Sequence, residues 1–121
     1  MHPALRLLYI AVIMVVIDTP WLMANTNMPG GAGDVMRAVQ GGRPMVFRYA
    51  AAVPVYLAMA YLLTKARSVW EAAAIGGAAY AIYDFTNYAL FKDYTLTFAL
   101  MDTTWGAILF AAAYWLTKDR A

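Results

Sequence analysis

Four long stretches of mostly apolar residues dominate this sequence and constrain its fold more than any other feature. They cover about residues 4–23, 44–64, 69–91 and 95–117. Each is close to the roughly 20 residues that an α-helix needs to cross a bilayer. With 64% hydrophobic and only 13% charged residues, the chain has too little polar surface to enclose such stretches in a soluble domain. The sequence therefore predicts an integral membrane protein.

These stretches are predicted to form helices, because backbone groups in lipid must bond within the protein and no alternating β-barrel pattern is present. The tight connections over 65–68 and 92–94 require antiparallel neighbours. The long connection, 25–43, contains the helix-breaking run Met28–Gly31 and then a short helical segment at the interface, Asp34–Gln40. We therefore predict one all-α domain over residues 1–121, an integral membrane four-helix bundle.

Basic residues indicate the orientation of this multi-pass protein. Four crossings place both termini on one side of the membrane, and the first stretch is expected to be a retained span because Leu22 stands where signal cleavage needs a small residue. Cytoplasmic segments carry more Lys and Arg, so a five-to-four distribution favours termini inside. The terminal side has Arg6, Lys65, Arg67, Lys118 and Arg120, and the other side has Arg37, Arg43, Arg48 and Lys92.

Three aspartates interrupt the apolar stretches. Counted from the predicted helix ends at 1.5 Å per residue, Asp18, Asp84 and Asp102 all lie on the order of 7–11 Å below the same membrane face. Ionisable groups in a membrane usually face a bundle interior or an aqueous cavity. The sequence therefore predicts a buried polar layer, whose expected members are Asp18, Arg48, Asp84, Thr86, Asn87, Asp102 and Thr103.

Aromatic and small residues accompany this layer. Asp18 and Asp102 each begin an Asp-Thr-x-Trp tetrapeptide, on helices that run in opposite directions. The predicted aromatic flank of the layer is Trp21, Tyr83 and Trp105. Small residues recur at every fourth position of the third stretch, a spacing typical of close helix contact. The predicted packing positions are Ala73, Gly77, Ala81 and Gly106.

The polar layer has three interpretations. In the first, the layer is structural: its groups form hydrogen bonds between helices and an Arg–Asp ion pair. Some of the acids are then uncharged, because burial and nearby like charges favour the protonated form. Alternatively it is a site for protons, cations or a polar head group. Paired carboxyl groups of an enzyme are the third interpretation, but the sequence has no Ser-His-Asp, HExxH or P-loop pattern. With no cysteine and one histidine, His2, we predict no catalytic set, no cofactor, no metal and no nucleic-acid partner.

Two motifs resemble a known family. Tyr83–Asn87 and Leu100–Gly106, together with Asp18-x-x-Trp21, are similar to the small predicted membrane proteins grouped as domain of unknown function 2177. The resemblance extends over nearly the whole chain. It implies a four-span membrane protein of a kind encoded by bacteria and by large DNA viruses of algae. It implies no settled activity.

Three functions are consistent with these features. The leading hypothesis is a structural or interaction component of a larger assembly, such as the internal membrane of a virion or a multi-subunit complex, because the chain has little mass outside its apolar stretches. Its partners would be the lipid bilayer and other membrane, capsid or complex proteins, or further copies of itself. The alternative is a minimal transporter or channel for protons, cations or small solutes that uses the three aspartates. The third is a membrane enzyme acting on lipid or isoprenoid substrates.

Overall fold

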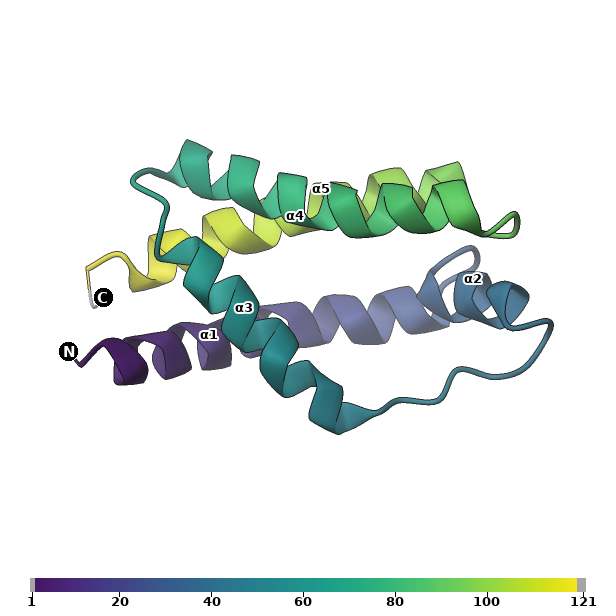
Figure 1. Ribbon diagram of the computed structural model, residues 1–121, viewed down its shortest axis with the longest axis horizontal. Coiled ribbons are helices and arrows are strands. Elements are labelled where there is room, and N and C mark those ends of the chain that lie inside the picture. Colours follow the sequence, from purple (N-terminus) through teal and green to yellow (C-terminus); the bar gives the residue numbers. More distant parts are fainter. Residues whose placement is uncertain (1, 120–121) are drawn as a thin grey trace.

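The computed structural model describes residues 2–119, so the expected contribution of Arg120 to the terminal side lies outside the described residues. Over residues 2–119 the chain is 78% helical and has no strand. The predicted all-helical class is therefore confirmed. In chain order the elements are α1 (Pro3–Asn27), α2 (Ala32–Val39), the 3-10 turn η1 (Tyr49–Ala51), α3 (Ala52–Leu63), α4 (Val69–Leu90) and α5 (Leu96–Thr117) (Figure 1).

The helices form a bundle with two distinct ends. Figure 1 shows α1, α4 and α5 along the long axis, with α3 crossing α1 obliquely. α5 packs against α4 and also contacts α1, while α3 contacts α1 and α4. α1 begins and α5 ends at the same end, which we call the terminal end, and the α3–α4 connection lies there too. α2 and the α4–α5 turn lie at the opposite end, the loop end.

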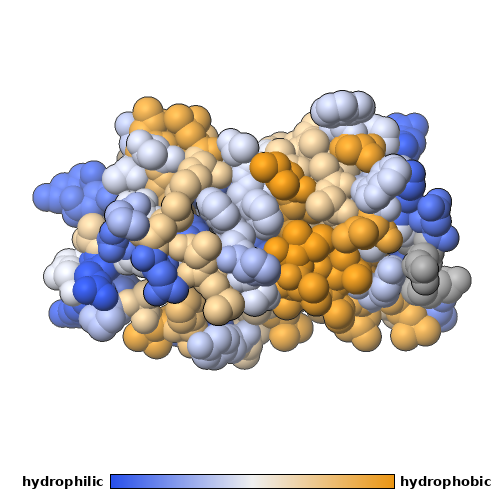
Figure 2. Space-filling view, turned by 180° about the vertical axis from the view of Figure 1, so that it is seen from behind, coloured by the Kyte–Doolittle hydropathy of each residue, from blue (hydrophilic) through white to orange (hydrophobic). Residues whose placement is uncertain are grey.

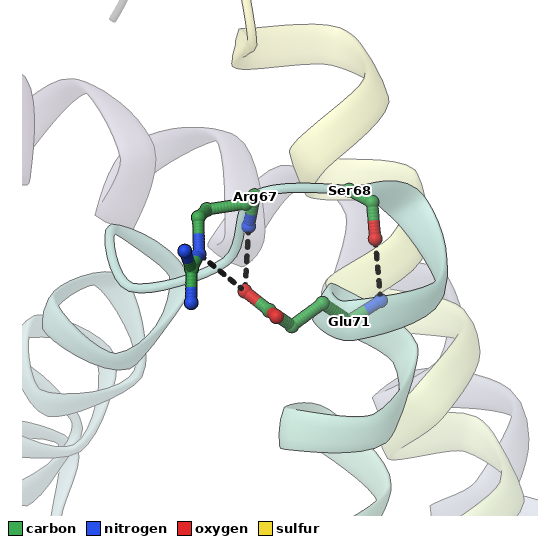
Figure 3. A network of polar contacts seen from close by, with 3 residues as sticks. All are labelled: Arg67, Ser68 and Glu71. Atoms are coloured by element: carbon green, nitrogen blue, oxygen red, sulfur yellow. Dashed lines mark hydrogen bonds and ion pairs between the residues drawn. The ribbon is translucent and has the colours of Figure 1, made fainter.

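Side-chain caps determine where α4 and α5 begin. Ser68 Oγ accepts a hydrogen bond from the Glu71 backbone N–H (3.0 Å), and Glu71 Oε1 accepts one from the Arg67 backbone N–H (2.8 Å) (Figure 3). This arrangement resembles a capping box, except that Glu71 accepts from the residue before the N-cap rather than from the N-cap residue Ser68 itself. Thr95 Oγ1 accepts from the Phe98 backbone N–H (3.1 Å) at the start of α5. Local sequence thus sets the helix starts, and with them the level of each acid along its helix.

The second apolar stretch forms less helix than predicted. A helix was expected from residue 44, but η1 begins at Tyr49 and α3 at Ala52. Residues 43–48 are non-helical. Met45 is partly buried and lines a cavity together with Phe47, while Val46 and Phe47 remain 79% and 51% exposed. The segment thus runs along the surface and contacts the bundle through few side chains, a tertiary arrangement that helical propensity does not include.

The predicted interfacial segment corresponds to α2, with a different start. We expected it to begin at Asp34, but the helix begins at Ala32. Asn25 Oδ1, near the end of α1, accepts a hydrogen bond from the Ala32 backbone N–H (3.1 Å). Asp34 lies in the first turn and accepts from the Gly30 backbone N–H (2.9 Å). A cap supplied from the preceding helix therefore moves the start of α2.

Two buried clusters lie on either side of the acids. The larger one fills the terminal half and joins α1, α3, α4 and α5 around Met14, Leu109 and Phe110. The smaller one, around Val35 and Phe98, packs α2 against the loop end of α5. The acids of α1 and α5 fall between these clusters along the chain. Apolar packing at both ends therefore holds the level at which the helices carry their acidic residues.

The close contact between α4 and α5 uses a different face of α4 from the predicted one. Ala73, Gly77 and Ala81 are only partly buried. A Cβ added to Gly76 would collide with the Gly106 carbonyl and with Phe110, whereas one added to Gly77 would stay 3.6 Å from Ala107 Cβ. The contact face is therefore shifted by one residue, because the position of α5 selects the face and several faces of α4 carry small residues. Its members are Ala72, Gly76 and Tyr80 on α4 and Gly106 on α5.

The outer surface is rich in hydrophobic side chains. Figure 2 shows hydrophobic residues over the middle of one face and hydrophilic residues toward its two ends. Within residues 2–119, two helices are long and apolar enough to cross a membrane: α1, with a mean hydropathy of 2.0, and α5, with 1.4. A four-span bundle is therefore not confirmed, although a membrane protein fits this surface.

Candidate functional site

Asp18 lies where three helices meet. It belongs to α1 and is 4% exposed. Tyr56 of α3 donates its hydroxyl hydrogen to Asp18 Oδ2, and Trp105 of α5 donates its indole N–H to Asp18 Oδ1 (2.7 Å). Both oxygens of this carboxyl group therefore have a protein donor. Because an unpaired polar group in a bundle interior is costly, these bonds tie α1, α3 and α5 together at one level.

Asp84 is the most buried of the acids, with 0% exposure. The Tyr94 hydroxyl donates to its Oδ1 (2.6 Å), and the Thr103 hydroxyl lies 3.5 Å from its Oδ2. Tyr94 comes from the α4–α5 turn and is 2% exposed. Burial, together with its bond to Asp84, raises the pKa of the Tyr94 hydroxyl, which keeps it in the protonated form that donates. Through its bond with Tyr94, Asp84 thus holds the α4–α5 turn against the helices.

Asp102 differs from the other two acids. It lies on α5, is 9% exposed, and lines a cavity. No N–H or O–H group of residues 2–119 donates a hydrogen bond of ordinary geometry to it. The Asp84 carboxyl group and the buried Trp21 indole N–H both approach it, in contacts that fall short of ordinary hydrogen-bond geometry. Asp102 is therefore a buried acid with unused hydrogen-bonding capacity.

The two Asp-Thr-x-Trp tetrapeptides pair with each other in a crossed manner. Trp105 of the second donates to Asp18 of the first, while Trp21 of the first neighbours Asp102 of the second. The two indole rings stack, with centroids 5.2 Å apart and planes at 18°. Because α1 and α5 run antiparallel, an acid and a tryptophan three residues apart on each helix lie opposite their counterparts. This crossed pair explains why the chain uses the same tetrapeptide twice.

A cleft runs past these residues between α1, α3, α4 and α5. One part has a volume of about 280 Å³ and extends from the α2 and residue 45–47 region to the acids. A second part, of about 390 Å³, lies between α3 and α4. Both parts are lined by Val55, Tyr80, Tyr83 and Asp102, and the first also by Asp18, Trp21 and Trp105. No lysine or arginine in the described part of the chain lines either, so the cleft is acidic and aromatic.

Two expected members of the polar layer lie elsewhere. Arg48 is exposed, and so are the residues on either side of it, because the chain runs along the surface here before α3 begins. An Arg–Asp clasp was therefore a wrong expectation for Arg48. Thr86 is also exposed, since it lies on the outer face of α4 two residues from buried Asp84. Asn87 is partly buried, and Thr103 contributes through its contact with Asp84.

The structure adds residues that the sequence did not identify. Tyr56 and Tyr94 are the hydroxyl donors of two acids, and Asn25, 2% exposed, caps α2. The sequence does offer a way to find the two tyrosines. A buried carboxyl group requires hydrogen-bond donors, and neighbouring segments carry tyrosines at about the depth of the acids. Depth counting missed Tyr56 because the second helix begins later than expected.

The acids do not form a metal cage. Among residues 2–119, no three histidine, cysteine or acidic side chains are grouped to hold a metal ion. The donors on Asp18 and Asp84 come from different elements, and each acid uses both of its oxygens. The arrangement therefore presents one carboxyl group, that of Asp102, to an aromatic cleft.

An all-helical chain with exposed apolar helices and buried acids defines a helical membrane protein. Comparison with known families agrees with this class. The family described as predicted membrane protein (DUF2177, domain of unknown function 2177) matches residues 4–118, and the chain belongs to this family. The expected resemblance is thus confirmed. No curated protein and no solved structure matches the chain.

Proposed function

We propose that this protein is a four-span membrane protein that binds a small positively charged species in the acidic cleft and moves it across the bilayer. The observation that carries the proposal is Asp102, which is buried, lines the cleft and receives no hydrogen bond of ordinary geometry from the described residues. Intramembrane acids that face a cavity are typical of substrate and ion pathways.

Helix lengths support four crossings. α4 has 22 residues, which corresponds to about 33 Å, comparable to the hydrocarbon thickness of about 30 Å. η1 and α3 together have 15 residues, which is short for a span. The non-helical residues before them continue along the molecule toward the loop end (Figure 1). Non-helical backbone is acceptable at membrane depth where it lines a cavity, as Met45 and Phe47 do.

The geometry favours transport over the purely structural role that led the sequence analysis. A structural polar layer requires that each buried acid have its own donors, which describes Asp18 and Asp84. Asp102 does not follow this pattern, because its polar neighbours, the Asp84 carboxyl group and the Trp21 indole N–H, make no hydrogen bond of ordinary geometry with it. A carboxyl group on a cleft wall is where a cation or a proton would bind.

Transport is testable in liposomes reconstituted with purified protein. An internal pH dye and cation-sensitive dyes report flux under an imposed gradient. We expect flux with the wild-type protein and its loss, by about tenfold or more, in Asp102→Asn. Asp93→Asn is the matched control, because it makes the same change at an exposed position of the α4–α5 turn.

Two results would contradict the proposal: unchanged flux in Asp102→Asn, or no flux of any tested ion or amine by folded wild-type protein. Gentle solubilisation from the native membrane then tests the structural role. A stable co-purifying partner, together with absent flux, would favour an assembly component.

A further inference from the structure

The number of carboxyl groups that are open to the cleft limits how many cationic groups a ligand can contact directly. Both oxygens of Asp18 accept hydrogen bonds, from Tyr56 and Trp105. Asp84 is likewise occupied by its bonds from α5 and the α4–α5 turn. Asp102 alone of the three receives no hydrogen bond of ordinary geometry from the described residues. One such carboxyl group can contact one cationic group, which points to a ligand with a single positive charge.

The walls of the cleft determine what kind of monovalent cation fits. Around Asp102 they consist of aromatic rings and apolar side chains, including Trp21, Tyr80, Tyr83 and Val55. A bare inorganic ion needs several oxygen ligands to replace its hydration shell. Aromatic faces instead attract ammonium groups and bury their carbon substituents. The lining therefore favours an organic ammonium over a hydrated metal ion.

The Trp21 indole N–H strengthens this assignment. This atom is buried, and its contact with Asp102 falls short of ordinary hydrogen-bond geometry. A buried N–H and a buried carboxyl group that satisfy each other only in part leave hydrogen-bonding capacity for a ligand beside them. The two parts, of about 280 and 390 Å³, are of the size that holds a small molecule.

We infer that the cleft binds a small organic ammonium ion, with its nitrogen beside the Asp102 carboxylate and its carbon groups against Trp21, Tyr80 and Tyr83. The inference rests on the proposed function, because it names the species bound in the same cleft. It also predicts something that transport alone does not predict, namely that binding depends on the aromatic rings of the cleft.

Binding is measured by tryptophan fluorescence in detergent micelles. The chain has four tryptophans, and Trp70 and Trp115 are exposed (83% and 61%). Replacing these two by phenylalanine leaves the stacked Trp21 and Trp105 as reporters. Choline is the probe, and its uncharged isostere 3,3-dimethylbutan-1-ol is the control. We expect a saturable signal with choline that is tighter by about tenfold or more than with the isostere.

Variants separate the carboxylate from the rings. Asp102→Asn should abolish the choline signal, and Asp93→Asn should keep it. Tyr83, which is 54% exposed, tolerates substitution and tests the aromatic wall even if Asp102→Asn does not fold. Tyr83→Phe should retain choline binding, whereas Tyr83→Leu should weaken it by about threefold or more.

The inference is overturned if the isostere binds as well as choline, if folded Asp102→Asn binds choline normally, or if Tyr83→Leu and Tyr83→Phe behave alike. Failure of the inference is distinguishable from failure of the transport proposal. Proton or inorganic cation flux that depends on Asp102, without choline binding, would overturn the inference alone. Choline binding without any flux would overturn transport and leave the ligand assignment standing.

Discussion

At the residue scale, the polar layer depends on donors that approach each acid from a different element. Asp18 is bonded from α3 and α5, and Asp84 from α5 and the α4–α5 turn. Because little water is present in a bundle core to replace a lost donor, each such bond holds two elements at a fixed level. Asp102 has no comparable bond and lines the cleft instead.

The bond between Tyr94 and Asp84 should be measurable as stability. Tyr94→Phe removes the hydroxyl donor but keeps the ring, whose edge contact with Phe98 has a centroid separation of 5.4 Å. We expect a loss of about 1–2 kcal/mol in the free energy of unfolding, measured by denaturant titration in mixed micelles. Tyr88→Phe makes the same change at a residue that is 43% exposed, and should have little effect. Equal stability of the two variants would contradict a role for this bond.

At the element scale, α4 and α5 pack through glycines that allow their backbones to approach closely. Gly76 lies against the Gly106 carbonyl, and Gly106 lies beneath the Tyr80 ring. This contact brings Asp84 and Asp102 together two to three turns of α4 further along. Close packing of small residues is the usual way in which membrane helices associate.

Neighbouring glycines of α4 provide a matched test of this contact. In Gly76→Ala the new methyl group meets backbone and the ring of Phe110, so we expect the two helices to separate and stability to fall by about 1–3 kcal/mol. Gly77→Ala meets only Ala107 at 3.6 Å and should be neutral or stabilising by up to about 1 kcal/mol. The comparison uses thermal unfolding in detergent. If Gly77→Ala were the more damaging variant, the predicted face rather than the observed one would be the contact.

At the scale of the whole molecule, the bundle has chemically different ends. The terminal end holds both chain ends and the α3–α4 connection, and the loop end holds α2 and the α4–α5 turn (Figure 1). Hydrophilic residues gather at the two ends and hydrophobic ones between them (Figure 2). Four crossings would place the two ends in different compartments.

Labelling of single cysteines tests this topology, since the sequence contains no cysteine. Lys65→Cys and Lys118→Cys mark the terminal end, and Arg43→Cys and Asp93→Cys mark the loop end. With termini inside, a membrane-impermeant maleimide added to intact cells should label positions 43 and 93. Positions 65 and 118 should react only after permeabilisation. Labelling of positions 65 and 93 from the same side would rule out the four-span arrangement.

Much of this fold follows from local sequence. Apolar stretches and their breaks predicted the all-helical class and the three long helices α1, α4 and α5, whereas the second stretch forms a shorter helix than expected. The capping residues Ser68 and Thr95 set helix starts through contacts with residues three positions away. Asp18, Asp84 and Asp102 were identifiable as one layer because depth along a helix depends only on counting residues.

Tertiary structure alone decided how the acids are used. Whether Arg48 turns inward depends on the path of the non-helical residues 43–48, which run along the surface and leave Arg48 exposed. Which face of α4 meets α5, and which tyrosines donate to which acids, depends on helix rotation and tilt, which a sequence of many small residues leaves open. The sequence by itself determined where the charges lie along each helix. Packing across helices decided that two acids are satisfied and that Asp102 faces the cleft, since that outcome depends on the relative placement of four helices.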